Sequence, residues 1–158
     1  MNFEGKVAVI TGSSAGIGAE AAKKITSLGG RVTINYSKSK EAAEEVAHEC
    51  SRLGEAPLII KADIANDEGC KHLIDTAFSE FSAINILINN AGRTKFADHS
   101  NLDALQRDDF EDILALNLNS NYELIKHARP HLAKNRKSSI VNISVSYTHL
   151  TLPTIVGV

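Results

Sequence analysis

Three glycines follow the first apolar run of the sequence at a spacing that suits binding of a diphosphate. The segment Thr11–Gly18 reads TGSSAGIG and joins the apolar run Val7–Ile10 to a stretch of helical periodicity. Gly12 permits a tight turn, Gly16 lets the backbone approach a pyrophosphate, and Gly18 allows the helix to pack close to the sheet. The N–H groups at the start of that helix carry about half a unit of positive charge toward the phosphates. An ordinary turn also needs glycine, so the weight of this signal comes from its place between a strand and a helix.

The elements around this turn alternate between short apolar runs and helical stripes. Each run is too short for a helix and ends in turn residues, so it predicts a strand. Five strands are expected, at 7–10, 32–34, 58–60, 84–88 and 140–143. Because the runs are continuously apolar, they indicate a parallel sheet covered on both faces. Strict alternation of strands and helices with right-handed crossovers predicts an α/β fold with a doubly wound parallel sheet, the Rossmann fold.

Four helices are expected between the strands, each with an apolar stripe at helical spacing. The first three stripes are Ile17, Ala21, Ile25 and Leu28; then Ala43, Val46, Ala47, Cys50 and Leu53; then Cys70, Leu73, Ile74, Ala77, Phe78 and Phe81. Gly29 and Gly54 are expected to end the first two helices, and Asp67 to cap the third. The fourth helix starts near Asp108 and carries Phe110, Ile113, Leu114, Asn117, Asn121, Ile125, Ala128 and Leu132. Pro130 should kink or end it.

The spacing G-x-x-x-G-x-G resembles the TGxxxGxG fingerprint of the short-chain dehydrogenase/reductase family, and three further segments match that family in order. Asn89–Gly92 reads NNAG, Asp63 and Ile64 match the position that contacts the adenine ring, and Asn117 matches the asparagine of the Asn-Ser-Tyr-Lys catalytic tetrad. The resemblance covers residues 6–143. It implies an oxidoreductase that transfers hydride between a nicotinamide dinucleotide and a small carbonyl or alcohol substrate. The dinucleotide-binding residues that it implies are Gly12, Ser13, Ser14, Gly16, Ile17, Gly18, Asp63, Ile64, Asn90, Ala91 and Gly92.

Asn117 has a simpler interpretation as a capping or surface asparagine. Its place on the apolar stripe argues for a structured partner, because an unpaired buried amide costs about 1–3 kcal/mol. We therefore expect its side chain to be hydrogen-bonded and to take the family's catalytic role.

The end of the second strand indicates which nicotinamide cofactor is used. A carboxylate there would hold the ribose 2′-OH of NAD and repel the 2′-phosphate of NADP. The sequence instead has Tyr36, Ser37 and Lys38, whose hydroxyls and ammonium suit a phosphate. Against this, NADP-preferring relatives often carry a basic residue at the position of Ala15, and Lys38 could be a solvated loop charge. We expect NADP in preference to NAD.

The sequence after the fifth strand departs from the family pattern. In the family, IVNISS ends in a catalytic serine, and a Tyr-x-x-x-Lys follows, whose tyrosine is the general acid. Here Val145 takes the serine position, and Thr151 rather than lysine stands four positions after Tyr147. Ser146, Tyr147 and His149 are not expected to catalyse the reaction, and the chain as given is expected to be inactive.

Residues 145–154, VSYTHLTLPT, resemble a translated sequencing adapter. We therefore expect 1–143 to be an incomplete NAD(P)-binding Rossmann domain, truncated after the fifth strand, and 144–158 to be a non-native tail. The alternative is a natural, divergent tail. Truncation would leave Ile140, Val141 and Ile143 on a sheet edge, which favours aggregation or partial unfolding.

Composition excludes several other classes of function. A formal net charge of −2 with interspersed signs gives no basic patch for nucleic acid. The start of the sequence does not resemble a signal peptide, and no apolar stretch reaches the roughly 20 residues that span a bilayer. Cys50 and Cys70 lack CxxC spacing and are expected to be reduced thiols, with no metal site, in a cytoplasmic protein.

Three functions remain to be distinguished. The leading hypothesis is the oxidoreductase, whose parent protein the family resemblance implies to be a homodimer or homotetramer. The segment 35–46 resembles 3-oxoacyl-carrier-protein reductases and sugar dehydrogenases, but it holds adenosine rather than substrate. A non-catalytic dinucleotide-binding module is the alternative. An α/β methyltransferase would share the glycine loop, but NNAG and Asn117 argue against it.

Overall fold

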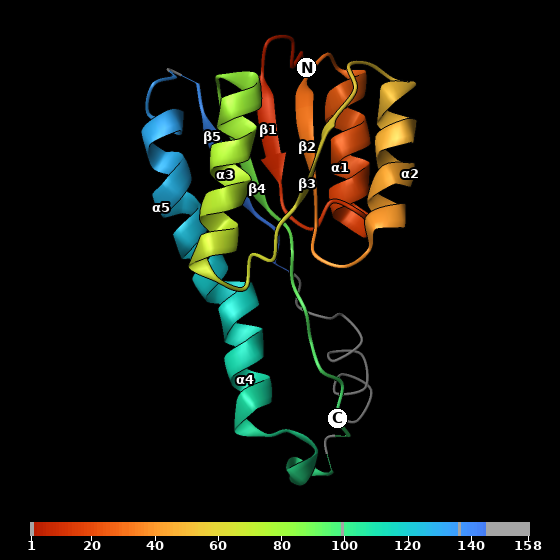
Figure 1. The fold of residues 1–158 in the computed structure, drawn as a ribbon. Coiled ribbons are helices and arrows are strands. Elements are labelled where there is room, and N and C mark those ends of the chain that lie inside the picture. Colours follow the sequence, from red (N-terminus) through yellow and green to blue (C-terminus); the bar gives the residue numbers. More distant parts are fainter. Residues whose placement is uncertain (1, 99, 136, 145–158) are drawn as a thin grey trace, which may run out of the picture.

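The computed structural model describes residues 2–98, 100–135 and 137–144. Its centre is a five-stranded parallel sheet in the order β3-β2-β1-β4-β5 (Figure 1). The strands are β1 Val7–Ile10, β2 Arg31–Tyr36, β3 Leu58–Lys61, β4 Ile86–Asn89 and β5 Ser139–Asn142. All five expected strands are present, and the doubly wound parallel sheet predicted from the apolar runs is confirmed. The strand order reverses direction between β1 and β4, which is where open α/β sheets bind their ligands.

Helices cover the sheet on both faces and bury two apolar clusters. The helices α1 (Gly16–Ser27) and α2 (Lys40–Ser51) lie together on one face. On the other face α3 (Asp67–Phe81) packs against α5 (Ser120–Leu132). The strands β1 and β4 are buried between these layers, which explains their uninterrupted apolar sequences.

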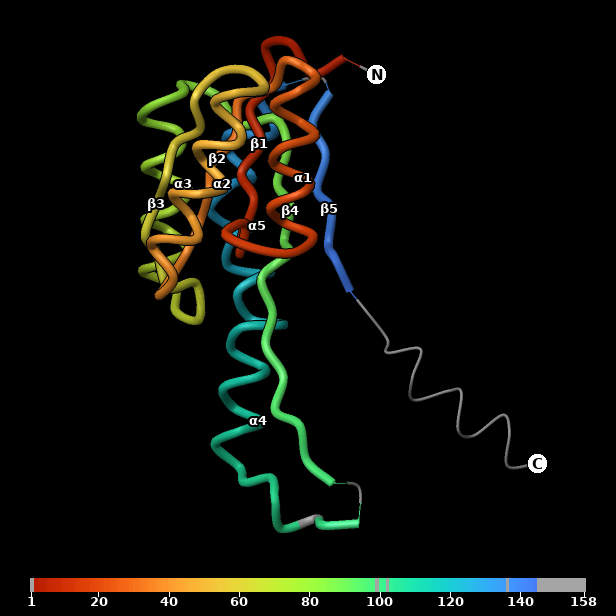
Figure 2. Tube along the Cα trace, turned by 90° about the vertical axis from the view of Figure 1, so that its right-hand side faces the viewer, coloured from red at the N-terminus to blue at the C-terminus, as the bar shows by residue number. Residues whose placement is uncertain are grey.

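A further helical segment projects beyond the carboxyl ends of the strands. It consists of the short 3₁₀ turn η1 (Leu102–Ala104), the helix α4 (Arg107–Leu114) and the π-helical turn η2 (Ala115–Asn119), which leads into α5. Figures 1 and 2 both show α4 extending away from the sheet. At the start of α4, the backbone N–H of Gln106 donates a hydrogen bond of 2.8 Å to Asp109 Oδ2.

The expected fourth stripe is therefore buried in its second half only. Of the expected stripe, Ala128 and Leu132 are buried on α5 and Ile125 is half-buried, whereas no residue of α4 is buried and Phe110 is 54% exposed. Leu124, which the expected stripe did not include, is also buried. The helix α4 extends past the edge of the sheet, so its apolar side chains have no sheet to pack against. The periodicity of the sequence cannot show at which residue the burial of the stripe stops. The helix ends at Leu132, soon after Pro130.

Three other local predictions were wrong. Leu53, expected on the apolar stripe of the second helix, is 49% exposed and follows the end of α2. The cap of α3 is Asn66, whose Oδ1 accepts the N–H of Gly69 at 2.8 Å, rather than Asp67. Ile17, expected on the buried stripe of α1, is 57% exposed. The buried face of α1 runs through Gly18, Ala19 and Ala22, because Gly18 lets that side of the helix lie close to the turn after β1 and to Asn90. Ile17 consequently points out at the carboxyl ends of the strands.

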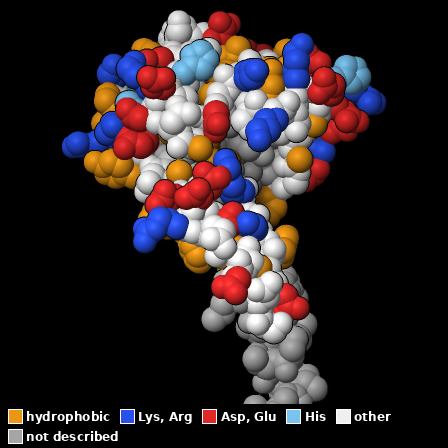
Figure 3. Space-filling view, turned by 60° about the horizontal axis from the view of Figure 1, so that its bottom comes forward, with side chains coloured by type: hydrophobic (Ala, Val, Ile, Leu, Met, Phe, Trp, Pro, Cys, Tyr) orange, Lys and Arg blue, Asp and Glu red, His pale blue; other side chains and the backbone are white. Residues whose placement is uncertain are grey.

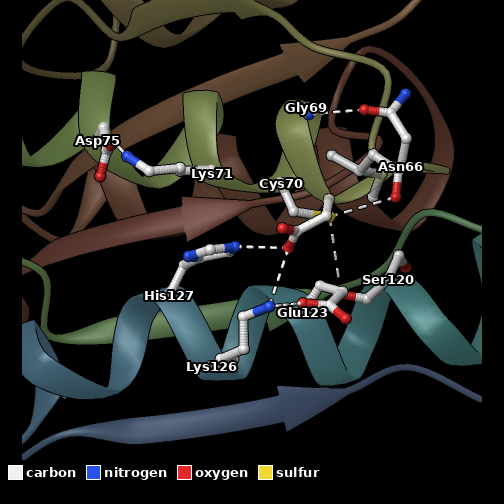
Figure 4. A network of polar contacts seen from close by, with 11 residues as sticks. Asn66, Gly69, Cys70, Lys71, Asp75, Ser120, Glu123, Lys126 and His127 are labelled. Carbon is white, nitrogen blue, oxygen red and sulfur yellow. Dashed lines mark hydrogen bonds and ion pairs between the residues drawn. The ribbon is translucent and has the colours of Figure 1, made fainter.

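Asp67 instead joins α3 to α5 through a group of charged side chains (Figure 4). His127 Nε2 lies 2.7 Å and Lys126 Nζ lies 3.2 Å from Asp67 Oδ1, and Lys126 also pairs with Glu123. The hydrogen bonds from His127 and Lys126 hold the pKa of Asp67 below its ordinary value. Cys70 lies beside this group, and burial raises its pKa to about 12. Cys50 and Cys70 are both free and buried, as expected for reduced thiols.

In the described part of the chain, β5 is the last strand on its side of the sheet. Ile140 is 44% exposed and Val141 is 41% exposed, whereas Ile143 packs partly against the core. The exposed apolar edge expected from the sequence is present for the first two residues. None of the helices described here is long and apolar enough to cross a lipid bilayer.

Candidate functional site

The turn after β1 and the loop after β4 are joined by hydrogen bonds at the point where the strand order reverses. Thr11 Oγ1 accepts the backbone N–H groups of Asn90 at 2.9 Å and Ala91 at 3.0 Å. In return, Asn90 Nδ2 donates to the carbonyls of Thr11 at 3.0 Å and Gly12 at 3.2 Å. This exchange fixes the NNAG loop against the glycine-rich turn, so the two motifs named from the sequence form one site.

Close backbone contacts explain two of the three glycines. A Cβ on Gly18 would lie 2.5 Å from Asn90 Nδ2 and 2.8 Å from the carbonyl oxygen of Gly12. Gly12 has φ +60°, and a Cβ there would lie 2.9 Å from Ala91 Cα. Both glycines therefore allow the loop after β4 to approach the turn after β1.

Gly16 differs because the space beside it is open. Its φ is +57°, and apart from its chain neighbours and the backbone of its own helix no atom lies within 4 Å of the place where a Cβ would stand. The N-cap residue of α1 is Ala15, which offers no side chain to bond the first N–H groups of the helix. An open backbone beside uncapped N–H groups fits a diphosphate, which binds such groups directly.

Asn35 holds the glycine-rich turn in place through its buried side chain. It was not identified from the sequence as a site residue. Its side chain is buried at the end of β2, where Oδ1 accepts the N–H of Gly12 at 3.1 Å and Nδ2 donates to the carbonyl of Ala62 at 3.1 Å. An amide between the apolar Ile34 and the aromatic Tyr36 at the end of a buried strand is the signal that could have found it.

The Ser13 hydroxyl is also internal. It donates to the carbonyls of Ile10 at 2.8 Å and Thr33 at 3.3 Å, and it accepts the N–H of Asn35 at 2.9 Å. Ser13 thus holds β1 to β2, and its hydroxyl does not face the open site.

A pocket of about 360 Å³ lies beside the turn at the ends of β1, β2 and β3. Among the residues predicted to bind the dinucleotide, it is lined by Gly12, Ser14, Tyr36, Ser37, Lys38, Asp63, Ile64, Asn90, Ala91 and Gly92. Asp63 Oδ1 accepts the N–H of Ala65 at 3.1 Å, and Ile64 is buried. Ser13, Gly16, Ile17 and Gly18 do not line this first pocket.

A second pocket, of about 540 Å³, lies between the turn, α4 and the end of β5. It shares Asn90, Ala91, Gly92 and Arg93 with the first pocket, and Ile17, Asn117, Asn121 and Asn142 are among its other lining residues. Figure 3 looks toward this end of the molecule, where Lys and Arg side chains alternate with Asp and Glu side chains around a hollow. Two adjoining pockets that share one loop can hold two parts of a long ligand, or a cofactor and a substrate side by side.

Asn117 is exposed but has the structured partner that the sequence predicts. Its Oδ1 accepts the N–H of Arg93 and its Nδ2 donates to the carbonyl of the same residue. The pairing ties η2 to the segment after β4, which runs along α4. Arg93 was not identified from the sequence, because nothing in the local pattern separates it from an ordinary loop cation.

Asn142 on β5 was likewise not identified from the sequence. Its Oδ1 accepts a hydrogen bond from Asn89 Nδ2 at 2.8 Å, and Asn89 Oδ1 is buried without a partner. The first asparagine of NNAG thus connects β4 to β5 beside the second pocket. Val145, Tyr147, His149 and Thr151 lie outside the described residues, as does the predicted tail apart from Ser144, which lines the second pocket.

One group of side chains elsewhere has the geometry of a metal site. Ligand atoms of Asp67, Glu123 and His127 lie within 4.8 Å of one another. Lys126 contacts both carboxylates, so a cation already balances their charge. We assign no metal to this group.

Comparison with known proteins agrees with this geometry. A family model described as short chain dehydrogenase matches residues 6–156. The chain is 36% identical over 141 residues to a ketoacyl reductase of granaticin polyketide synthase from Streptomyces violaceoruber, covering 89% of this chain and 55% of that protein. It is 32% identical over 139 residues to a 3-oxoacyl-[acyl-carrier-protein] reductase from Staphylococcus aureus, covering 88% of this chain and 55% of that protein. The chain thus spans little more than half the length of these relatives.

A solved structure of the same family has the same fold as this chain. A short chain dehydrogenase from Burkholderia cenocepacia, crystallised in complex with NADP, superimposes with a TM-score of 0.83 at 30% identity, covering 98% of this chain and 64% of that one. Sequence match, sheet order and site geometry agree, and this chain belongs to the short-chain dehydrogenase/reductase family.

Proposed function

We propose that this chain is the cofactor-binding part of an oxidoreductase that transfers hydride between NADP(H) and a carbonyl or alcohol substrate. The observation that carries the proposal is the exchange of hydrogen bonds between Thr11 and Asn90. This exchange joins the glycine-rich turn to the loop after β4, and both pockets share that loop. A bound nicotinamide dinucleotide would supply or accept the hydride. The first pocket would hold its adenosine, and the turn would hold its diphosphate. Of the residues predicted from the sequence, Ser13 would act by holding the turn in shape, because its hydroxyl and its N–H are bonded inside the chain.

Support for NADP over NAD comes from the end of β2. Tyr36, Ser37 and Lys38 line the first pocket, and no carboxylate stands among them to repel a 2′-phosphate. A structural neighbour that is 30% identical is an NADP complex, and the relatives include a 3-oxoacyl reductase. We therefore propose an NADP-preferring enzyme with a 3-oxoacyl-like or sugar-like substrate. The cytoplasmic location and the homodimeric or homotetrameric assembly expected from the sequence remain part of this proposal.

For catalysis, Asn117 is the member of the tetrad that we propose from this chain. It lines the second pocket and positions the loop after β4. No Tyr-x-x-x-Lys follows β5 in the sequence. Tyr122 and Lys126 have that spacing, but Tyr122 does not line the second pocket and Lys126 Nζ is held by Asp67 and Glu123. We therefore propose that residues 1–158 bind the dinucleotide without turnover.

A fluorescence titration of NADPH and NADH into the 158-residue chain tests this proposal. Circular dichroism and a thermal melt first establish that the sample is folded. We expect NADPH to bind more tightly than NADH, and no oxidation of NADPH with carbonyl compounds. A folded sample that binds neither dinucleotide would contradict the proposal.

A pair of lysine variants tests the cofactor preference. Lys38→Ala should weaken NADPH binding by about fivefold, the value of an exposed ion pair of about 1 kcal/mol, and leave NADH binding unchanged. Lys24→Ala is the matched control, because Lys24 is also exposed but lies in the last turn of α1, away from both pockets. Equal effects of the two variants would argue against a role for Lys38.

A further inference from the structure

Arg93 is the charged side chain that the second pocket offers to a ligand. The described residues that line this pocket are otherwise apolar or carry hydroxyls and amides, including Asn117, Asn121 and Asn142. None of the described residues that line the second pocket is acidic, so the one formal charge that they contribute to its wall is positive. A guanidinium favours planar anions, because it can donate two parallel N–H groups to a carboxylate or phosphate.

The backbone of Arg93 is held in place independently of its side chain. Asn117 bonds both the N–H and the carbonyl of Arg93, at 2.9 Å and 2.8 Å. Asn121 Nδ2 in turn donates to the carbonyl of Asn117 at 3.0 Å. The guanidinium thus extends from a fixed point on the pocket wall, because the bonds that fix this point are made by the backbone of Arg93.

The nearby cations differ in how firmly they are already paired. Lys95 Nζ lies 2.6 Å from Asp109 Oδ2, and this ammonium holds the pKa of Asp109 below its ordinary value. Arg93 Nη1 lies 3.7 Å from Asp112 Oδ2, and the two side chains are 44% and 74% exposed. An exposed pair at that distance is weak, and a ligand carboxylate in bidentate contact can replace it.

We propose that Arg93 recognises an anionic group, a carboxylate or a phosphate, on the carbonyl or alcohol substrate. The proposal rests on the proposed function, which places the substrate in the second pocket. It narrows the substrate class to oxo acids, hydroxy acids and their phosphate counterparts. The competing role for Arg93 is contact with a cofactor phosphate, because Arg93 also lines the first pocket. The first pocket has Lys38 and the turn for phosphates, whereas Arg93 is the cation of the second.

The test compares two charged probes with neutral counterparts that keep the same carbonyl group. Acetoacetate and methyl acetoacetate, and dihydroxyacetone phosphate and dihydroxyacetone, are titrated by ligand-observed NMR into the 158-residue chain. Each titration is run with and without saturating NADPH. We expect the acid to bind at least fivefold more tightly than its ester. Stronger binding of dihydroxyacetone phosphate than of acetoacetate would identify phosphate as the preferred group.

Three variants assign that selectivity to Arg93. Arg93→Met should remove the preference for the acid over the ester while the affinity for the ester stays the same. Arg93→Lys should keep part of the preference for the acid. Asp112→Asn should increase acid binding about twofold, because it frees the guanidinium. Arg107→Met is the matched control and should change nothing, since Arg107 is exposed on α4 and does not line either pocket.

Two results would overturn the inference. One is an equal affinity for acid and ester in the unsubstituted chain. The other is an Arg93→Met variant that binds NADPH more weakly while its ratio of acid to ester binding is unchanged, which would assign Arg93 to the cofactor. Failure of the proposed function is a distinct result: a folded chain would bind no dinucleotide, whether or not it binds the acid and ester probes.

Discussion

The amide of Asn117 forms a two-point pair with the backbone of Arg93. Asn117 Oδ1 accepts the Arg93 N–H at 2.9 Å, and Asn117 Nδ2 donates to the Arg93 carbonyl at 2.8 Å. The two residues lie in the π-helical turn η2 and in the loop after β4, and both line the second pocket. The pair therefore sets the position of one wall of that pocket relative to the other.

Asn117→Asp should weaken this wall. The carboxylate keeps the acceptor for the Arg93 N–H but loses the donor to the Arg93 carbonyl, so the free energy of unfolding should fall by about 1 kcal/mol. Urea unfolding followed by circular dichroism measures the change. Asn119→Asp is the matched control, because Asn119 is exposed in the same π-helical turn. Equal losses in both variants would mean that the pair contributes nothing.

Asn35→Leu should destabilise the chain and weaken dinucleotide binding together. The substitution leaves the N–H of Gly12 and the carbonyl of Ala62 without their side-chain partner, at a cost of about 1–3 kcal/mol for each buried group. Thermal unfolding and NADPH titration report the two effects. Tight NADPH binding by a destabilised variant would show that Asn35 supports the sheet but not the turn.

Two glycines with the same backbone conformation separate strain from crowding. Gly5 has φ +68° with open space around it, whereas Gly12 has φ +60° and a Cβ added there would lie 2.9 Å from Ala91 Cα. Gly5→Ala should cost about 1–2 kcal/mol for the left-handed backbone. Gly12→Ala should cost a further 1–3 kcal/mol, about the usual penalty of overpacking, and should weaken NADPH binding. Chemical denaturation of both variants measures the two losses in the free energy of unfolding. Equal losses would show that the loop after β4 can move to make room for the added methyl group.

Acid should weaken the contact between α3 and α5 through Asp67. Because the pKa of this carboxyl is lowered in the folded chain, its stabilising effect is present above the ordinary Asp value of about 3.9 and is lost as the pH falls toward the folded value. The urea midpoint should therefore fall more between pH 7 and pH 3 for the unsubstituted chain than for Asp67→Asn. Asp75→Asn serves as the control, since Asp75 pairs with Lys71 on its own helix. Parallel pH curves for the unsubstituted chain and Asp67→Asn would refute this assignment.

The edge at β5 should promote self-association of the 158-residue chain. Ile140 and Val141 are exposed there on the last described strand of the sheet, and such edges pair with other chains. Ile140→Lys should lower the fraction of aggregated or oligomeric chain in analytical ultracentrifugation. Leu53→Lys, which adds the same charge at an exposed leucine following α2, should not. A monomeric, cooperatively melting sample without either substitution would contradict the prediction.

The sequence by itself determined the strands, the alternation with helices and the diphosphate-binding turn. These features depend on local physics: the length of apolar runs, the freedom of Gly12 and Gly16 at positive φ, and the start of a helix directly after a strand. The NNAG segment and Asn117 were found because the family resemblance attaches meaning to single residues.

The tertiary structure alone decided which side chains meet. Asn35 bonds Gly12 across 23 positions and Asn117 bonds Arg93 across 24 positions, and no local pattern encodes such pairs. Exposure of Ile17 and of the stripe on α4 depends on where the sheet ends, which periodicity cannot show. Local sequence sets the conformation of each segment, whereas the partner of a polar side chain is set by the packing of segments far apart in the chain.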